Sequence, residues 1–379
     1  MCGHRPHLHL GPAEAPVNDG VDQDRMTDEK ARLLVFIATP LESEHVERIR
    51  AVAPDRLEVI FEPDLLPPTR YVADHKGRSD FRWTPEQEKR WRGHLGRADI
   101  LWDFPPSASD GTPGIELARR LKWIQTTSSG VGQYVKELGI QDSDILITTA
   151  RGVHAGPLAE FVFLALLSHA KRLAHLQAEQ RAHHWARFCS DELTGKTLSI
   201  VGIGEVGRRV AALGPCFGMR VVALARAGSA RTAEQLGINA LFPQERLDEM
   251  LAGTDALVLT VPHTPETEGL IDEAAFRALK PGAVLVNIAR GQVVDQAALI
   301  RNLESGRLAF AALDPFAVEP LDPASPLWDM PNVLISPHSA STTTSENRKI
   351  TDIFCHNLRC YVENRHADMR NILDKKRLY

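Results

Sequence analysis

The sequence predicts an α/β protein built from two doubly wound parallel-sheet domains. From Leu33 onward, short β-rich runs alternate with helical patterns, which is typical of parallel strands joined by crossover helices. The chain has 379 residues, too many for one ordinary core. A glycine-rich loop also joins a strand to a helix at residues 202–207. The composition, 43% apolar and 25% charged, is that of a globular protein.

In the first half of the chain the alternation is loose. We expect strands at Leu33–Ile37, Leu57–Phe61, Ile100–Trp102, Trp123–Thr126 and Ile145–Thr148. Helices are expected at Leu41–Ala53 and about Gly114–Arg120. The stretch from Leu65 to Trp91 is irregular and rich in Pro, Arg and aromatic residues, so we expect a functional or mobile segment that could cover a cleft.

A long helix is expected to follow, from Pro157 to about Trp185. Its first half is apolar on nearly every face, which requires burial between layers or at a subunit contact. Its second half is basic and rich in histidine, which is typical of a solvated face.

The second half of the chain alternates strictly. We expect strands at Thr197–Val201, Arg220–Ala223, Ala256–Val261, Ala283–Ile288, Phe310–Leu313 and Val333–Ile335. Helices are expected at about Glu205–Leu213, Arg246–Leu251, Glu273–Ala278, Gln296–Leu303 and Thr344–Val362. This order predicts a Rossmann-like domain.

Charge and hydropathy exclude several classes of protein. Forty-four Lys and Arg residues against 49 Asp and Glu residues leave a net charge of −5, which argues against nucleic acid as the main partner. The longest apolar run, Phe161–Leu167, is too short to span a membrane. Five scattered cysteines and the lack of an apparent secretory signal favour a reducing, cytoplasmic setting without structural metal. Residues 1–30, rich in Gly, Pro, His and Asp, are expected to form a disordered leader rather than a metal site.

The glycine-rich loop predicts a dinucleotide site. It reads Gly202-Ile203-Gly204-Glu205-Val206-Gly207, directly after an apolar strand and at the start of a helix. Gly202 permits the tight turn, Gly204 lets the backbone approach a pyrophosphate, and Gly207 allows close packing of helix on sheet. The amino terminus of the helix then favours an anion.

The residues after the second strand of this domain favour NADP over NAD. An NAD site would place an acidic residue there, but no Asp or Glu occurs from Arg208 to Ala233. Arg226, Ser229 and Arg231 suit a 2′-phosphate by charge and hydrogen bonding. Ordinary surface arginines with relaxed cofactor choice are the alternative.

Three candidate reacting groups each follow the carboxyl end of an expected strand, where ligands bind in open α/β sheets. Arg290 can clamp a carboxylate with two hydrogen bonds, and His338 can exchange the proton that accompanies hydride transfer. Glu319 can hold and tune that histidine. Each residue alone has an ordinary structural explanation.

Together these motifs resemble the D-isomer-specific 2-hydroxyacid dehydrogenase family. The resemblance rests on the glycine loop, Asn287-Ile288-Ala289-Arg290-Gly291, Leu313-Asp314 through Glu319-Pro320-Leu321, and Pro337-His338-Ser339-Ala340. It covers about residues 120–345, and Pro315 departs from the Val usual after the aspartate.

The resemblance implies a role for each position. Arg290 would bind the substrate carboxylate and keto oxygen, His338 would be the acid–base, and Glu319 would hold it. The backbone of Ser129-Gly130-Val131-Gly132 would cradle the carboxylate. Asp314 would meet the nicotinamide carboxamide, and the cofactor-binding set would also include Val261, Pro262 and Ala289.

The family architecture further implies a cofactor domain, 151–337, inserted into a discontinuous substrate domain, 31–150 plus 338–379. The 157–185 helix would cross between them and contribute to a homodimer. The substrate would be a small 2-keto or 2-hydroxy acid, with Phe104 facing the cleft or packing the interdomain core. Glyoxylate or hydroxypyruvate reduction is the leading interpretation. A bulkier 2-keto acid such as phenylpyruvate, or a dinucleotide-sensing corepressor-like scaffold, is the alternative.

Overall fold

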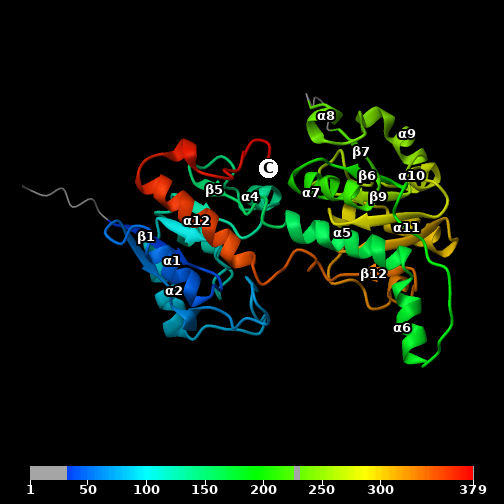
Figure 1. Cartoon of the computed structure of the whole chain (residues 1–379). Helices are drawn as coiled ribbons and strands as arrows, with labels where there is room; N and C mark the ends of the chain where they lie inside the picture. The colour runs from blue at the N-terminus through cyan, green and yellow to red at the C-terminus, as the bar shows by residue number, and fades with distance from the viewer. Residues whose placement is uncertain (1–31, 226–230, 379) are drawn as a thin grey trace, which may run out of the picture.

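The computed structural model describes residues 32–225 and 231–378, and Figure 1 shows them as two α/β units side by side. Each unit holds one sheet in which every strand pair is parallel. The predicted fold class, two Rossmann-like parallel sheets, is therefore confirmed. The expected leader, residues 1–30, lies outside the described residues.

The first unit contains a five-stranded sheet in the order β2-β1-β3-β4-β5. Its strands are β1 (Leu33–Ile37), β2 (Leu57–Ile60), β3 (Ile100–Trp102), β4 (Trp123–Gln125) and β5 (Leu146–Thr148). Its helices are α1 (Ser43–Arg50), α2 (Pro85–Arg97), α3 (Gly114–Leu117), α4 (Gly132–Glu137) and, from the far end of the chain, α12 (Glu346–Val362). Apolar clusters cover both faces of the sheet, so the unit has the buried parallel sheet of doubly wound folds.

The second unit contains a seven-stranded sheet in the order β12-β11-β10-β9-β6-β7-β8. Its strands are β6 (Thr197–Val201), β7 (Arg220–Leu224), β8 (Ala240–Phe242), β9 (Ala256–Leu259), β10 (Ala283–Asn287), β11 (Leu308–Leu313) and β12 (Val333–Ile335). Its helices are α5 (Ala155–Ala170), α6 (Leu173–Arg181), α7 (Glu205–Leu213), α8 (Ala233–Leu236), α9 (Leu247–Ala252), α10 (Glu273–Ala278) and α11 (Gln296–Glu304). The strand order reverses between β6 and β9, the switch point at which such sheets bind ligands.

The chain crosses between the units twice, through α5 and again before α12. Phe354 and Leu358 of α12 lie in one apolar cluster with Trp102 and Trp123 of the first sheet. The carboxyl-terminal helix therefore completes the amino-terminal unit, as Figure 1 shows. Within the described ranges, no helix combines the length and apolar character needed to cross a bilayer.

The expected helix at 157–185 is in fact two helices. α5 buries Val162, Phe163 and Leu166 against the second sheet, while α6 buries no side chain. Arg172 between them has φ of 54°, a left-handed conformation that ends a helix. The apolar half of the pattern marked a buried helix correctly, but the basic half does not continue it.

The irregular segment also conceals regular structure. α2 begins at Pro85, where Thr84 and Gln87 form a reciprocal capping box and proline occupies the first turn. Trp91 and Leu95 of this helix are fully buried against the sheet. The short α4 and the edge strand β8 were also absent from the expected elements, because neither is long enough to produce a clear period.

Candidate active site

The glycine loop follows β6 and opens α7 at the switch point of the second sheet. Gly202 has φ of 97°, and a side chain there would come within 2.8 Å of Val261 Cγ1. A side chain on Gly207 would overlap the carbonyl oxygen of Gly202. At Gly204, by contrast, an added Cβ would meet nothing within 4 Å. The loop thus leaves open space at the amino terminus of α7, which fits a pyrophosphate approaching the backbone.

Thr260 supports this loop from the neighbouring strand. Its hydroxyl donates to the carbonyl oxygen of Gly202 at 2.5 Å and lies within reach of the Val201 carbonyl oxygen at 3.2 Å. Val261 and Pro262, which were expected at the cofactor, follow at the carboxyl end of β9. Thr260 was missed by the sequence analysis because its role depends on β9 being paired with β6.

Arg290 stands on a turn after β10 that Asn287 shapes. The Asn287 side chain donates to the Arg290 carbonyl oxygen at 3.1 Å and accepts from the Ala289 amide at 3.0 Å. The Arg290 Nη1 group donates back to the Ala289 carbonyl oxygen at 2.7 Å. Asn287 is 2% exposed, so this turn is fixed from within the protein.

His338 and Glu319 form a close pair at the carboxyl ends of β11 and β12. The His338 Nδ1 atom lies 3.0 Å from both carboxylate oxygens of Glu319. An ionised carboxylate can only accept hydrogen bonds, so Nδ1 carries the proton and Nε2 is left for a substrate. Glu319 also accepts from the Phe316 amide at 3.0 Å, which fixes the orientation of the carboxylate.

Asp314 holds the loop that carries His338. Its Oδ1 atom accepts from the Ser336 hydroxyl at 2.6 Å and from the Ala340 amide at 2.9 Å. The His338 amide donates to the Asp314 carbonyl oxygen at 3.1 Å. His338 itself has φ of 53°, and residues in this region persist only where their surroundings hold them. Asp314 therefore fixes the histidine, a role that the sequence alone did not indicate.

The first unit contributes the loop Ser129–Gly132, between β4 and α4. Thr127 anchors it: its hydroxyl donates to Asp103 Oδ2 at 2.6 Å. Within the ranges that the structure describes, nothing accepts a hydrogen bond from the amides of Ser129, Gly130 or Val131. These free donors suit a carboxylate.

The two halves of the candidate site meet at Gly130 and Arg290. A Cβ added to Gly130 would lie 2.5 Å from the Arg290 Nη2 atom, so the guanidinium occupies the space beside the glycine. The absence of a side chain at Gly130 is what admits Arg290. Residues 160 positions apart in sequence thus come together from different sheets.

The electrostatic setting of Arg290 suits an anion. Burial lowers the pKa of its guanidinium, while attraction from Glu319 and Asp314 acts in the opposite direction. An arginine remains charged under such perturbation. A partly desolvated cation beside free amide donors would bind a carboxylate more strongly than a fully solvated one.

The other predicted residues have varied placements. Arg226 and Ser229 fall outside the described residues, and Arg231 is exposed just before α8. Phe104 is half-buried and packs edge-on against Tyr134 of α4, with ring centroids 5.0 Å apart. Ile203, Glu205 and Val206 lie in the glycine loop, where Glu205 pairs with Arg208.

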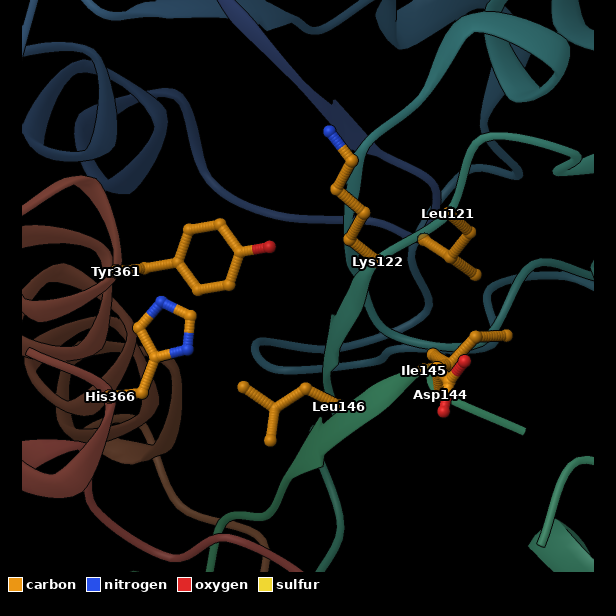
Figure 2. A pocket seen from close by; sticks show the side chains of 7 residues that line it. All are labelled: Leu121, Lys122, Asp144, Ile145, Leu146, Tyr361 and His366. Carbon is orange, nitrogen blue, oxygen red and sulfur yellow. The ribbon is translucent and has the colours of Figure 1, made fainter. Parts of the chain in front are cut away.

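A separate cavity of about 560 Å³ lies in the first unit (Figure 2). Leu121, Lys122, Asp144, Ile145, Leu146, Tyr361 and His366 line it. Lys122 and Ile145 precede β4 and β5, so the cavity is at the amino ends of these strands. The candidate active site lies at their opposite, carboxyl ends.

The chain belongs to the D-isomer specific 2-hydroxyacid dehydrogenase family. The family model described as its NAD binding domain matches residues 163–340. A glyoxylate reductase of Thermococcus gammatolerans is 34% identical over 238 residues, covering 58% of this chain and 70% of that protein. A D-3-phosphoglycerate dehydrogenase of Mycobacterium leprae is 38% identical over 227 residues. That match covers 57% of this chain but only 42% of the relative's length.

The whole fold also resembles solved structures. One is the NADPH-dependent glyoxylate/hydroxypyruvate reductase of Sinorhizobium meliloti, solved with NADP and sulfate. It is 26% identical, with a TM-score of 0.71, and the alignment covers 92% of this chain and 100% of that one. The expected family resemblance and an NAD(P)-binding domain are therefore confirmed.

Proposed function

We propose that this protein reduces a small 2-keto acid to a D-2-hydroxy acid, with NADPH preferred over NADH. Three observations support the proposal: Arg290 contacts the Gly130 loop, His338 pairs with Glu319, and Glu319 acts electrostatically on Arg290. These groups are a carboxylate clamp and an acid–base pair, which are the protein groups that such a reduction needs. The names of the relatives, glyoxylate reductases among them, support the same substrate class.

In this mechanism Arg290 and the amides of Ser129–Val131 hold the substrate carboxylate and orient the adjacent carbonyl. When bound, the reduced nicotinamide supplies the hydride to the carbonyl carbon. The imidazolium of His338 donates its Nε2 proton to the carbonyl oxygen, so that C=O becomes CH–OH. His338 is left neutral, with its Nδ1–H still hydrogen-bonded to Glu319, and solvent restores the Nε2 proton. Oxidation runs the same steps in reverse.

Cofactor preference is proposed from the basic stretch after β7. The segment from Arg208 to Ala233 lacks Asp and Glu, and β7 ends at Leu224 with Ala225 where an acidic ribose ligand would stand. We expect Arg226→Asp to lower kcat/KM for NADPH far more than for NADH, in initial-rate assays with each cofactor. Equal losses for both would remove the 2′-phosphate assignment.

A homodimer in the cytoplasm is the proposed state of the protein. α6 extends from the second unit with no buried residue (Figure 1). Leu173 and Leu176 on this helix are 40% and 43% exposed, and Trp185 after it is 96% exposed. Large apolar side chains exposed in this way favour contact with a second copy of the chain.

The deciding experiment is a steady-state screen with NADPH and with NADH. Glyoxylate, hydroxypyruvate, phenylpyruvate and 3-phosphohydroxypyruvate are the substrates, the last because of the phosphoglycerate dehydrogenase relatives. We expect the highest kcat/KM with glyoxylate or hydroxypyruvate and NADPH. Preference for phenylpyruvate would favour the bulky-substrate alternative. Tight dinucleotide binding without turnover of any acid would instead favour the scaffold alternative.

A further inference from the structure

The segment after α12 returns to the candidate active site. Figure 1 shows this red segment running from the end of α12 to the side of α4. It is attached to the edge of the first sheet, where the Thr149 amide donates to the Asn371 carbonyl oxygen at 2.9 Å. The Leu373 amide donates to the Ile147 carbonyl oxygen at 2.8 Å. These bonds extend the sheet beyond β5 and give the segment a fixed origin.

From there the segment contacts the loop that follows α4 and the first residue of α4. In the loop after the helix, the Lys375 ammonium donates to the carbonyl oxygens of Ser143 at 2.5 Å and Ile140 at 3.3 Å. At the amino-terminal end, the Leu378 carbonyl lies directly against Gly132, where any Cβ would overlap its oxygen. The segment therefore contacts α4 at its first residue and also holds the loop that follows the helix.

A tight turn gives the segment its shape between these points. The Leu378 amide donates to the Asp374 carbonyl oxygen at 2.7 Å. The Asp374 carboxylate accepts from the amides of Lys376 and Arg377 at 3.0 and 3.1 Å. Leu373, just before the turn, is 5% exposed and shares an apolar cluster with Val131.

The position of α4 determines the position of the substrate loop. Gly132 is the first residue of α4, and Gly130 stands only two residues before it, beside the Arg290 guanidinium. Two residues span at most about 7 Å of chain. A displacement of Gly132 would therefore move the amide donors that face Arg290.

We propose that segment 371–378 is a positioning element for the substrate-carboxylate loop, with Lys375 as its anchor. This proposal rests on the proposed function, since it assigns the segment to the substrate side of that site. The segment sets the affinity for the 2-keto acid and not for the dinucleotide. In the described chain its hydrogen bonds to other segments go to β5, the residues just after β5 and the loop after α4, and none reaches the glycine loop of the second unit. Lys375 touches neither substrate nor cofactor and acts through the loop.

The test compares Lys375→Met with Lys376→Met. Both remove one ammonium group, but in the described chain only Lys375 donates to carbonyl oxygens of the loop after α4, while Lys376 is exposed. We expect Lys375→Met to raise KM for the 2-keto acid about tenfold, the scale of losing a charge-assisted hydrogen bond. KM for NADPH should stay within twofold, and Lys376→Met should match the wild type. Lys375→Arg should recover most of the loss.

A second measurement does not depend on turnover. Hydrogen exchange of the amides in residues 129–137 should be faster in Lys375→Met than in Lys376→Met. Asp374→Ala loosens the turn at residues 374–378, and Asp374 is exposed, so this variant tests the positioning role if Lys375→Met fails to fold. It should raise the same KM about threefold.

The outcomes separate the two proposals. A wild-type protein inactive on every 2-keto acid would refute the proposed function, and the exchange comparison would still decide the role of the segment. Equal KM values and equal exchange in Lys375→Met and Lys376→Met would overturn the positioning role. A parallel rise in KM for NADPH would overturn it as well, because a general loss of structure would then explain both changes.

Discussion

At Gly130, the addition of a single methyl group should lower catalytic activity without lowering the stability of the fold. An alanine Cβ there would lie 2.5 Å from the Arg290 Nη2 atom, whereas ordinary contact begins near 3.4 Å. The guanidinium must therefore move by about 1 Å. Because it is the far end of a flexible side chain, this movement costs little folding free energy. The Gly130 backbone has no positive φ, so alanine adds no backbone strain.

A displacement of this size matters for catalysis because Arg290 orients the substrate. A misplacement of about 1 Å in a positioning group can lower the rate by ~100-fold, or ~2.7 kcal/mol in transition-state free energy. We expect Gly130→Ala to lower kcat/KM for the 2-keto acid by roughly 30- to 100-fold. KM for NADPH and the thermal midpoint should remain close to those of the wild type.

The assay is initial-rate NADPH oxidation together with a thermal unfolding scan. Gly93→Ala is the matched control, since a Cβ at this position in α2 meets nothing within 4 Å. It should leave kcat/KM unchanged and add about 0.5–1 kcal/mol of stability as a helix-interior substitution. If Gly130→Ala keeps kcat/KM within threefold of the wild type, Arg290 is not the group that orients the substrate.

Three further predictions concern other parts of the molecule. His338→Ala should abolish turnover while leaving the dinucleotide Kd, measured by fluorescence titration, within a few-fold of the wild type; retained kcat would refute its acid–base role. Glu346 lies at the start of α12 and accepts hydrogen bonds from His75 and His154, both at 3.2 Å. Burial by itself raises the pKa of Glu346, but these hydrogen bonds outweigh burial and lower the pKa from 4.5 to about 2. A carboxyl group whose pKa is lowered in the folded state stabilises the fold above pH 4.5, and this stabilisation is lost as the pH falls toward 2. Glu346→Gln should therefore lower the free energy of unfolding in urea by roughly 2 kcal/mol at pH 7, and the difference from the wild type should shrink below pH 4.5. A difference that does not change with pH would contradict this prediction. Leu176→Glu should convert the proposed dimer to monomer in light scattering, and an unchanged molar mass would place any dimer contact elsewhere.

Elements are predictable from the sequence where local pattern and tertiary role coincide. The strands of the second sheet are apolar runs with turn signals on both sides, and all six that were expected are present within a few residues. Residue spacing likewise pointed to Arg290, Glu319 and His338, because each follows a strand whose carboxyl end faces the same edge of the sheet. The structure brings Glu319 and His338 within hydrogen-bonding distance.

Elements are not predictable from the sequence where their conformation depends on remote contacts. The 157–185 pattern gave no sign of the break at Arg172, which separates a helix that packs on the sheet from one that buries none of its residues. α2 was hidden because aromatic and proline residues around it obscured the capping box at Thr84. Asn287 stands within a motif that the sequence shows, but its function as a support for Arg290 depends on side-chain hydrogen bonds of the folded turn. The support that Asp103 gives the substrate loop likewise depends on a contact made only in the fold.

By itself the sequence determined the class of fold, the dinucleotide loop and the chemical types at the reacting centre. These depend on short-range relations: strand periodicity, glycines at fixed offsets, and polar residues just after strands. Only the tertiary structure decided that Gly130 admits Arg290, that Asp314 fixes the His338 loop, and that residues 371–378 close on α4. Each of those contacts joins segments that are far apart in sequence. The order of strands in a sheet, or the packing of one unit on the other, brings them together. No local pattern specifies that order, because it is selected by the burial of whole apolar faces.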